Sequence, residues 1–182
     1  MQTERSVSLV FKYLNEKKVK ILEVATSLFV EQGYEKTSVT NICEKAGVSK
    51  GLIYHYLKSK ELILIEIFTE TTNKMLSLIQ KSETKVKPNI QLINLIESIF
   101  TQLESDKIFF QLNLNIMFQP STKKILQKQI YERGQILFDS VKNIFDKLLV
   151  ENSRINTYIF IAEIDGIALN YLSVFENYPL KK

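Results

Sequence analysis

Apolar residues recur at intervals of three and four along almost the whole chain, and this spacing constrains the fold more than any other feature. Such a period gathers apolar side chains on one face of an α-helix. Residues that end helices and turn strands are scarce, since the 182 residues include only five glycines and three prolines. The sequence therefore predicts an all-α protein with enough residues to bury a core in one domain or two.

Cysteine and histidine usage excludes several classes of protein. The chain has one cysteine, Cys43, and one histidine, His55, so it can form neither an internal disulfide nor the usual set of zinc ligands. Cys43 lies at an inward position and is interpreted as a small buried apolar residue rather than a redox sensor. Paired carboxylates, a nucleophile with its base and a glycine-rich phosphate loop are missing. We therefore expect no enzyme, no metal and no other cofactor.

Signals for membrane insertion and export are also missing from the sequence. No run approaches the roughly eighteen apolar residues that span a bilayer. Residues 1–20 lack an apolar core and a small-residue cleavage site. We expect a cytoplasmic protein that has no membrane partner.

The segment 36–60, KTSVTNICEKAGVSKGLIYHYLKSK, predicts two short helices joined by a tight turn. Ser38 begins the first helix with a weakened capping box. Gly47 turns the chain, and Ser49 caps the second helix, at residues 50–57. Two such helices form a helix-turn-helix unit, which is the arrangement of many DNA-reading proteins.

The excess positive charge of the chain is confined to the same segment. Residues 1–35 hold five Lys or Arg and five Glu, residues 36–60 hold five Lys and one Glu, and residues 61–182 hold fourteen of each sign. The net charge of +4 therefore arises within this one stretch. A bound polyanion and a solvated lysine-rich face explain the charge count equally well.

Four side chains of the segment form the sharpest candidate site: Lys50, Tyr54, His55 and Lys60. Lysines, tyrosine hydroxyls and the amides of helix N-termini hold phosphates, and residues at the start of a recognition helix reach base edges. The lone His55 is interpreted as a phosphate contact rather than a catalytic group. Tyr54 is interpreted as outward, whereas packing and DNA contact remain alternatives for Tyr56.

Helices outside this segment follow from the same period and its interruptions. We expect one helix from residue 15 or 16 to Gly33, and a weak apolar stripe in residues 1–14 leaves open whether this helix begins earlier. A long helix that Ser59 caps should end near Lys81. The division between domains is expected along the long helix. Polar residues and prolines separate the later helices, which are expected at about 89–104, 106–119, 121–150 and 153–177.

The second half is rich in bulky apolar residues, which line small-molecule pockets when a few polar groups accompany them. Aromatic residues at helical spacing are also typical of plain core, so core and pocket remain alternatives for each residue. The candidates for a ligand pocket are Phe109, Phe110, Asn113, Met117, Phe118, Tyr131, Phe138, Tyr158 and Glu163.

The last expected helix carries more apolar surface than one packing partner requires, which predicts self-association. Asp165-Gly166 interrupts its pattern, and a glycine within a helix costs about 1 kcal/mol relative to alanine, which a close helix approach offsets. The candidates for a dimer interface are Ile161, Asp165, Gly166, Leu169 and Leu172.

Residues 18–66 resemble the DNA-binding domain of the TetR/AcrR family of bacterial transcriptional regulators. The matching positions are Ile21, Leu22, Ala25, Leu28, Phe29, Gly33, Tyr34, Thr37, Ser38, Val39, Ile42, the run AGVSKG at 46–51, Ile53 to Tyr56, and Lys58 to Leu62. The resemblance implies a DNA-binding domain at residues 1–60 and a helical ligand-binding and dimerisation domain at residues 61–182. Carried over by position, the implied DNA contacts are Thr37, Ser49, Lys50, Gly51, Leu52, Tyr54, His55 and Lys60. Asp165-Gly166 is also similar to an Asp-Gly pair that is frequent in the last helix of the family.

Two positions depart from the family pattern. Leu52 stands where threonine is frequent in the family. Leucine lacks the hydroxyl of threonine but can contact the methyl group of a thymine. Leu57 stands where phenylalanine is usual. The resemblance implies a homodimeric repressor that binds a palindromic double-stranded DNA operator and leaves it when a small hydrophobic or amphipathic effector binds. The alternative is a helical ligand carrier or protein-interaction module whose basic segment binds a protein.

Overall fold

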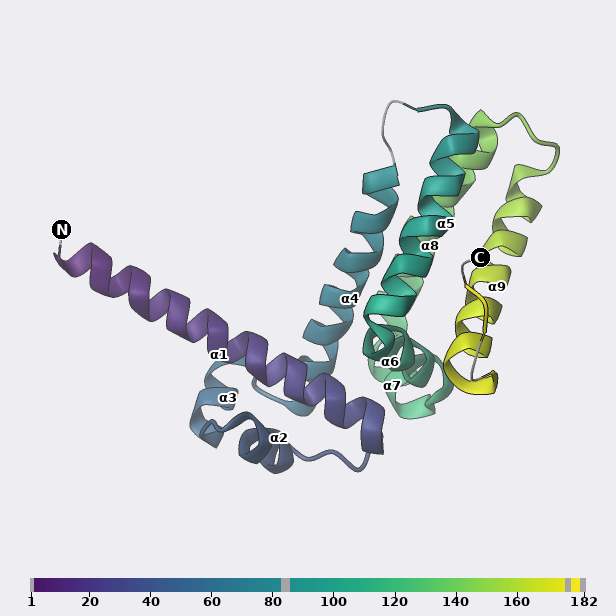
Figure 1. The fold of residues 1–182 in the computed structure, drawn as a ribbon. Coiled ribbons are helices and arrows are strands. Elements are labelled where there is room, and N and C mark those ends of the chain that lie inside the picture. The colour runs from purple at the N-terminus through teal and green to yellow at the C-terminus, as the bar shows by residue number, and fades with distance from the viewer. Residues whose placement is uncertain (1, 83–85, 176–177, 181–182) are drawn as a thin grey trace. The chain divides into compact units, whose positions relative to one another are not determined.

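The structure is a computed structural model that describes residues 2–82, 86–175 and 178–180, with side chains for these except residues 2–14 and 82. Every regular element in the described part of the chain is helical (Figure 1), as the apolar period predicts. The helices are α1 (Gln2–Gln32), α2 (Val39–Ala46), α3 (Lys50–Tyr56), α4 (Lys60–Ser82), α5 (Pro88–Ser105), α6 (Lys107–Phe118), α7 (Pro120–Ile125), α8 (Gln127–Lys147), α9 (Ser153–Leu169) and a short π-helix (Asn170–Val174).

The chain forms two compact units, Met1–Phe68 and Thr69–Lys182, and the division falls within α4. In the first unit, α1 packs on α2 and α3, and the three helices and the start of α4 share one apolar core. The largest fully buried side chains of this core include Phe29, Ile42, Ile53 and Ile63. Each of these comes from a different helix, so the core fixes all four helices together.

The second unit is a helical bundle (Figure 1). Its most extensive helix pairing is between α8 and α9. One core cluster joins Ile79 of α4 to Leu95 of α5 and to Val141 and Ile144 of α8. A second cluster gathers residues of α5, α6 and α9 with the C-terminal Leu180. These clusters hold the helices whose inner faces surround the cavity that is described below.

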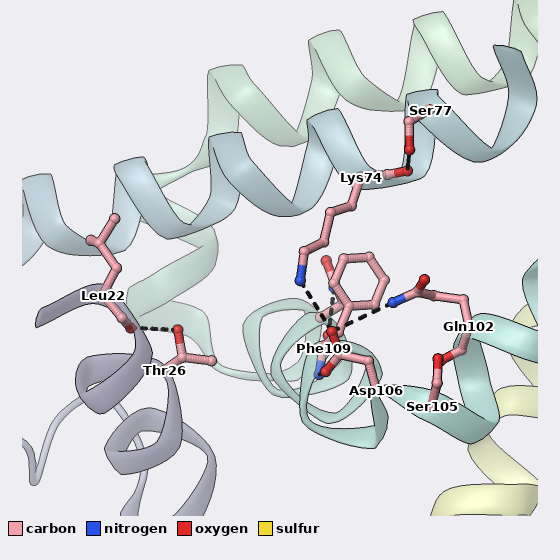
Figure 2. A network of polar contacts seen from close by, with 9 residues as sticks. Leu22, Thr26, Lys74, Ser77, Gln102, Ser105, Asp106 and Phe109 are labelled. Carbon is pink, nitrogen blue, oxygen red and sulfur yellow. Dashed lines mark hydrogen bonds and ion pairs between the residues drawn. The ribbon is translucent and has the colours of Figure 1, made fainter. Parts of the chain in front are cut away.

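Asp106 fixes the start of α6 within this bundle, as Figure 2 shows. Its Oδ1 accepts a hydrogen bond of 3.1 Å from the backbone N–H of Phe109 and so caps the helix. Its Oδ2 accepts from Lys74 Nζ of α4 at 3.1 Å and from Gln102 Nε2 of α5 at 3.4 Å. One carboxylate therefore ties three helices together at the end of the bundle where α6 begins.

The first helix begins at Gln2, so it includes residues 2–14, for which the sequence left this extension open. Two other expected helix boundaries differ from the structure. The helix expected at 121–150 is two helices, because the backbone departs from helical geometry at Leu126, with ψ near 11°, where the side chain is fully buried. The last helix changes to a π-helix after Leu169, and residues 176–177 of the expected helix lie outside the described residues.

The described residues contain no helix with the length and the apolar character that crossing a membrane requires. They also contain no group of three histidine, cysteine or acidic side chains placed to hold a metal ion.

Candidate DNA-binding surface and C-terminal cavity

The turn between α2 and α3 is defined by three local capping interactions. Ser38 and Asn41 form the predicted capping box, in which Ser38 Oγ accepts from the Asn41 N–H and Asn41 Oδ1 accepts from the Ser38 N–H. Gly47 ends α2 in the left-handed region, with φ of 65°, and its N–H donates to the carbonyls of residues 43 and 44. Ser49 caps α3 by accepting from the Leu52 N–H at 3.2 Å. Local sequence therefore sets both the turn and the start of α3.

The outer face of α3 presents most of the predicted contact residues to solvent. Ile53 and Leu57 are buried against the core, which orients the helix. On the opposite side, Tyr54 is 51% exposed. Ser49, Lys50, Gly51 and His55 are also exposed, and Leu52 is half-buried. This face offers two hydroxyls, an ammonium, an imidazole and an accessible backbone, which are groups that hold phosphates and read base edges.

Tyr56 and Cys43 belong to the interior of the first unit. The Tyr56 hydroxyl is buried, and its ring contacts the His55 ring edge-on at 5.0 Å between centroids. This placement favours packing over DNA contact for Tyr56. Cys43 is buried as well, and burial raises the pKa of its thiol. The thiol thus stays protonated and packs as a small apolar group.

Thr37 is a correction to the residues that the resemblance implies as DNA contacts. Its side chain is 1% exposed, and its hydroxyl donates to the carbonyls of Gly33 at 2.9 Å and Leu28 at 3.3 Å. The same oxygen accepts from Gln32 Nε2 at 3.1 Å. The hydroxyl therefore closes the C-terminus of α1 instead of facing a phosphate.

Lys60, another predicted DNA contact, has its ammonium group engaged within the first unit. Lys60 Nζ donates to the backbone carbonyls of Tyr34 and Thr37, both at 3.0 Å. It also lies 4.1 Å from the centroid of the Tyr34 ring, within the range of a cation–π interaction. The ammonium therefore ties the start of α4 to the loop after α1, and its contact with DNA stays a prediction.

The second unit encloses a cavity of about 470 Å³ between α4, α5, α6, α8 and α9. This volume falls within the range of small-molecule sites, about 300–1,000 Å³. Five of the nine predicted pocket residues line it, all from α6: Phe109, Phe110, Asn113, Met117 and Phe118. The wall is apolar apart from three polar side chains, Asn113, Arg133 and Asp165. The remaining apolar lining comes from every one of the five helices.

Four predicted pocket residues do not line this cavity: Tyr131, Phe138, Tyr158 and Glu163. Tyr131, Tyr158 and Glu163 are exposed, and the Phe138 ring packs against Tyr158 at 4.7 Å between centroids. Periodicity places them on a helix but does not say which face of that helix meets the cavity.

Arg133 is the functional candidate that sequence reasoning missed. Its side chain is 8% exposed, and its Nη1 donates to Asn113 Oδ1 at 2.7 Å. Burial lowers the pKa of Arg133 to about 10, while the negative charge of Asp165 acts to raise it. The guanidinium therefore stays protonated at neutral pH. The signal was present in the sequence. Arg133 falls on the inward stripe of α8 with Ile130 and Leu137, where a cation is unexpected.

Most of the predicted dimer residues also border the cavity. Ile161, Asp165, Gly166 and Leu169 line it, and Leu172 packs on the second core cluster. A Cβ built on Gly166 would meet no atom of another element within 4 Å among the described residues, so close packing inside the chain does not explain this glycine. Ile155, Tyr158 and Ile159 of α9 are each more than half exposed.

A helix-turn-helix with an exposed recognition helix, followed by a helical bundle around an apolar cavity, defines a class of protein. The class is the helix-turn-helix transcriptional regulator with a separate C-terminal helical domain.

Comparisons with known proteins place the chain within this class. Residues 21–67 match the family described as bacterial regulatory proteins, tetR family. The fatty acid metabolism regulator protein of Bacillus subtilis is 32% identical over 146 residues, which cover 77% of this chain and 70% of that protein. The HTH-type transcriptional regulator YuxN of the same organism is 30% identical over 138 residues, 74% of this chain but only 47% of YuxN. The match thus spans about half the length of that relative.

The fold comparison agrees with the sequence comparisons. The fatty acid degradation regulator FadR of Bacillus halodurans superposes with a TM-score of 0.76 and 21% identity, over 90% of this chain and 88% of that chain. The chain belongs to the TetR/AcrR family of transcriptional regulators.

Proposed function

We propose that the protein is a homodimeric repressor that binds a palindromic operator and releases it when a small amphipathic ligand enters the C-terminal cavity. The observation that carries the DNA-binding part is the outer face of α3, where Lys50, Tyr54 and His55 are all exposed beside a correctly capped helix start. Two such helices in a symmetric dimer would enter successive major grooves about 34 Å apart. The site of action would be the cytoplasm, where the DNA lies.

The dimer is supported by an exposed apolar stripe on α9. Ile155, Tyr158 and Ile159 are 56%, 55% and 53% exposed, and Gly166 follows on the same side of the helix. Apolar residues at this spacing form a surface that a second helix can cover.

The relatives indicate which genes to examine first. Two of the similar proteins carry names that refer to fatty acid metabolism or degradation. We propose that genes of this process are the regulated set, and that an operator lies upstream of them or of the gene for this protein.

Electrophoretic mobility shift with DNA from these upstream regions tests the proposal. We expect one discrete complex at a palindromic site and an affinity that falls steeply with salt, because lysine contacts to phosphates release counterions. A helical ligand carrier whose basic segment binds a protein would bind this DNA weakly and without sequence preference. A flat plot of log affinity against log salt concentration would contradict the phosphate contacts.

A screen of small molecules tests the release step. A true effector raises the melting temperature of the protein and lowers its affinity for the operator, since it must bind the two conformations with different affinity. A small molecule that binds the protein without changing its affinity for the operator would contradict the proposal that a ligand releases the DNA.

A further inference from the structure

The polar groups of the cavity are concentrated in one corner. Asn113, Arg133 and Asp165 are the polar side chains among the lining residues, and the rest of the wall is apolar side chain and glycine. A ligand that fills this space must bring one polar end to this corner and an apolar body to the other walls. The cavity therefore fits an amphiphile better than a uniformly apolar or uniformly polar molecule.

Arg133 is the deepest charged group of the corner, and Asn113 orients it. Both side chains are 8% exposed. Asn113 Nδ2 donates to the Phe109 carbonyl at 2.7 Å, while its Oδ1 accepts from Arg133 Nη1 at 2.7 Å. Both ends of the amide are thus used to hold the guanidinium in place. Arginine donates hydrogen bonds and accepts none, so a ligand group that meets it must be an acceptor.

The charge that the ligand's acceptor group carries decides which kind of group fits beside Arg133. A guanidinium carries one positive charge and matches a carboxylate in a planar, two-bond arrangement. A phosphate monoester would bring about −1.5 to −2 charges, which one guanidinium cannot balance inside an apolar cavity. The Asp165 side chain on α9 also lines this corner, and its negative charge already offsets part of the Arg133 charge. A second negative charge on the ligand would therefore be repelled. A single carboxylate is the anionic group that suits this corner.

We infer that the cavity binds an amphipathic monocarboxylate, with its carboxylate on Arg133 and its alkyl chain along the apolar walls, and that Asp165 opposes this binding. The inference rests on the proposed function, because it names the chemical class of the ligand that would release the operator. Arg133 and Asp165 then act with opposite signs on the same ligand, which a purely structural polar cluster would not do.

Calorimetric titration of the full chain without DNA tests the assignment. The probes are sodium salts of straight-chain fatty acids from octanoate to tetradecanoate, the alcohols of equal chain length, and alkyltrimethylammonium salts of equal length. We expect the carboxylate to bind roughly ten- to a hundredfold more tightly than the matched alcohol, as for a hydrogen bond to a charged group. Arg133→Gln should abolish this difference, Arg133→Lys should keep part of it, and Asp165→Asn should strengthen carboxylate binding several-fold.

Equal affinity for carboxylate and alcohol, or tighter binding of the ammonium probe, would overturn the inference. So would carboxylate affinity that Arg133→Gln leaves unchanged, or that Asp165→Asn weakens. If circular dichroism shows that Arg133→Gln does not fold, the comparison of head groups on the natural chain still decides the question.

The two proposals fail in different ways. Carboxylate binding that depends on Arg133 but leaves operator affinity unchanged would support the site and remove the release step. Release of the operator by the ammonium probe, with no binding of carboxylates, would support ligand-controlled release and overturn the carboxylate assignment.

Discussion

Lys60 and Tyr54 are both outward candidates by position in the sequence, yet the fold gives their side chains different surroundings. The Lys60 ammonium satisfies two backbone carbonyls and covers the Tyr34 ring. The Tyr54 side chain extends into solvent from α3. An ammonium group serves a phosphate and a carbonyl equally well, so residue type alone does not separate the two roles. The roles do separate in experiments on stability and on DNA binding.

Replacing each of these residues with alanine should affect different properties. We expect Lys60→Ala to lower the free energy of unfolding by about 2 kcal/mol, because two carbonyls lose a charged donor. Tyr54→Ala should leave the free energy of unfolding within about 0.5 kcal/mol of the natural chain and weaken operator binding about tenfold. Urea unfolding followed by circular dichroism and mobility shift measure the two effects. A Lys60→Ala protein of normal stability with weakened operator binding would return Lys60 to the DNA contacts.

Tyr34 gives the first unit a pH-dependent stability. Burial, followed by the charges of Glu61 and Glu35, raises the pKa of Tyr34 from 10.0 to about 12. The folded chain therefore keeps a proton between pH 10 and 12 that the unfolded chain loses. This contribution to stability is fully present below pH 10 and is lost as the pH rises through 12.

Tyr34→Phe isolates this contribution. We expect the free energy of unfolding of the natural chain to fall more steeply between pH 10 and 12 than that of the variant, because the other titrating groups are common to both. Urea unfolding at a series of pH values across this window measures both slopes. Parallel slopes would show that Tyr34 titrates normally in the folded chain.

At the scale of elements, two glycines flank the helix-turn-helix turn in different conformations. Gly47 has φ of 65°, in the region that side chains other than glycine rarely adopt, although a Cβ there would meet no neighbour within 4 Å. Gly51 lies within α3, where a Cβ would make only an ordinary contact of 3.9 Å with Ser49 Oγ. The fold therefore requires glycine at 47 and tolerates alanine at 51.

Alanine at these positions should change stability in opposite directions. Gly47→Ala should cost about 1–2 kcal/mol of unfolding free energy through backbone strain. Gly51→Ala should stabilise the fold by up to about 1 kcal/mol through helix propensity, yet weaken operator binding, because its methyl group would obstruct close approach of DNA to α3. Thermal unfolding and mobility shift test the pair. A stabilised Gly51→Ala protein with unchanged operator affinity would show that DNA does not approach the backbone at this point.

The second unit contains a helix break that the apolar period does not predict. The expected helix at 121–150 contains Leu126, whose side chain fills the core at the point where α7 ends and α8 begins. No glycine or proline marks the break between α7 and α8. Burial of one side chain, which depends on distant helices, decides the bend.

At the scale of the whole molecule, one recognition helix covers only half of a palindromic site. Coupling two copies makes the second contact intramolecular, which strengthens binding by a large factor when the spacing fits. The exposed stripe of Ile155, Tyr158 and Ile159 on α9 is the surface that we propose for this coupling.

A charge placed in the stripe should separate the copies. We expect Ile159→Glu to yield a folded monomer, because an unpaired carboxylate in an apolar interface is costly, and operator affinity should fall at least a hundredfold with the loss of coupling. Leu149→Glu is the matched control, since Leu149 is 91% exposed and lies in the loop after α8. Sedimentation velocity should show a dimer for the control. An Ile159→Glu protein that remains a dimer would exclude this face as the interface.

Short-range chemistry made much of the first unit predictable from the sequence. The capping box at Ser38, the left-handed Gly47 and the Ser49 cap each involve groups within four residues of one another, so the sequence alone determines them. The apolar period likewise determined that the protein is all-α and that Ile53 and Leu57 of α3 face inward. These features do not depend on where any distant helix lies.

Only the tertiary structure decided the roles of Thr37, Lys60 and Arg133. Most of their partners lie nine to 26 residues away, on other helices or in loops. A polar side chain takes whichever partner the packed backbone brings within hydrogen-bond reach, and burial makes an unpaired group costly. The apolar period predicts that a residue is helical and which face of the helix it occupies. The packing of the helices determines which groups lie next to that face.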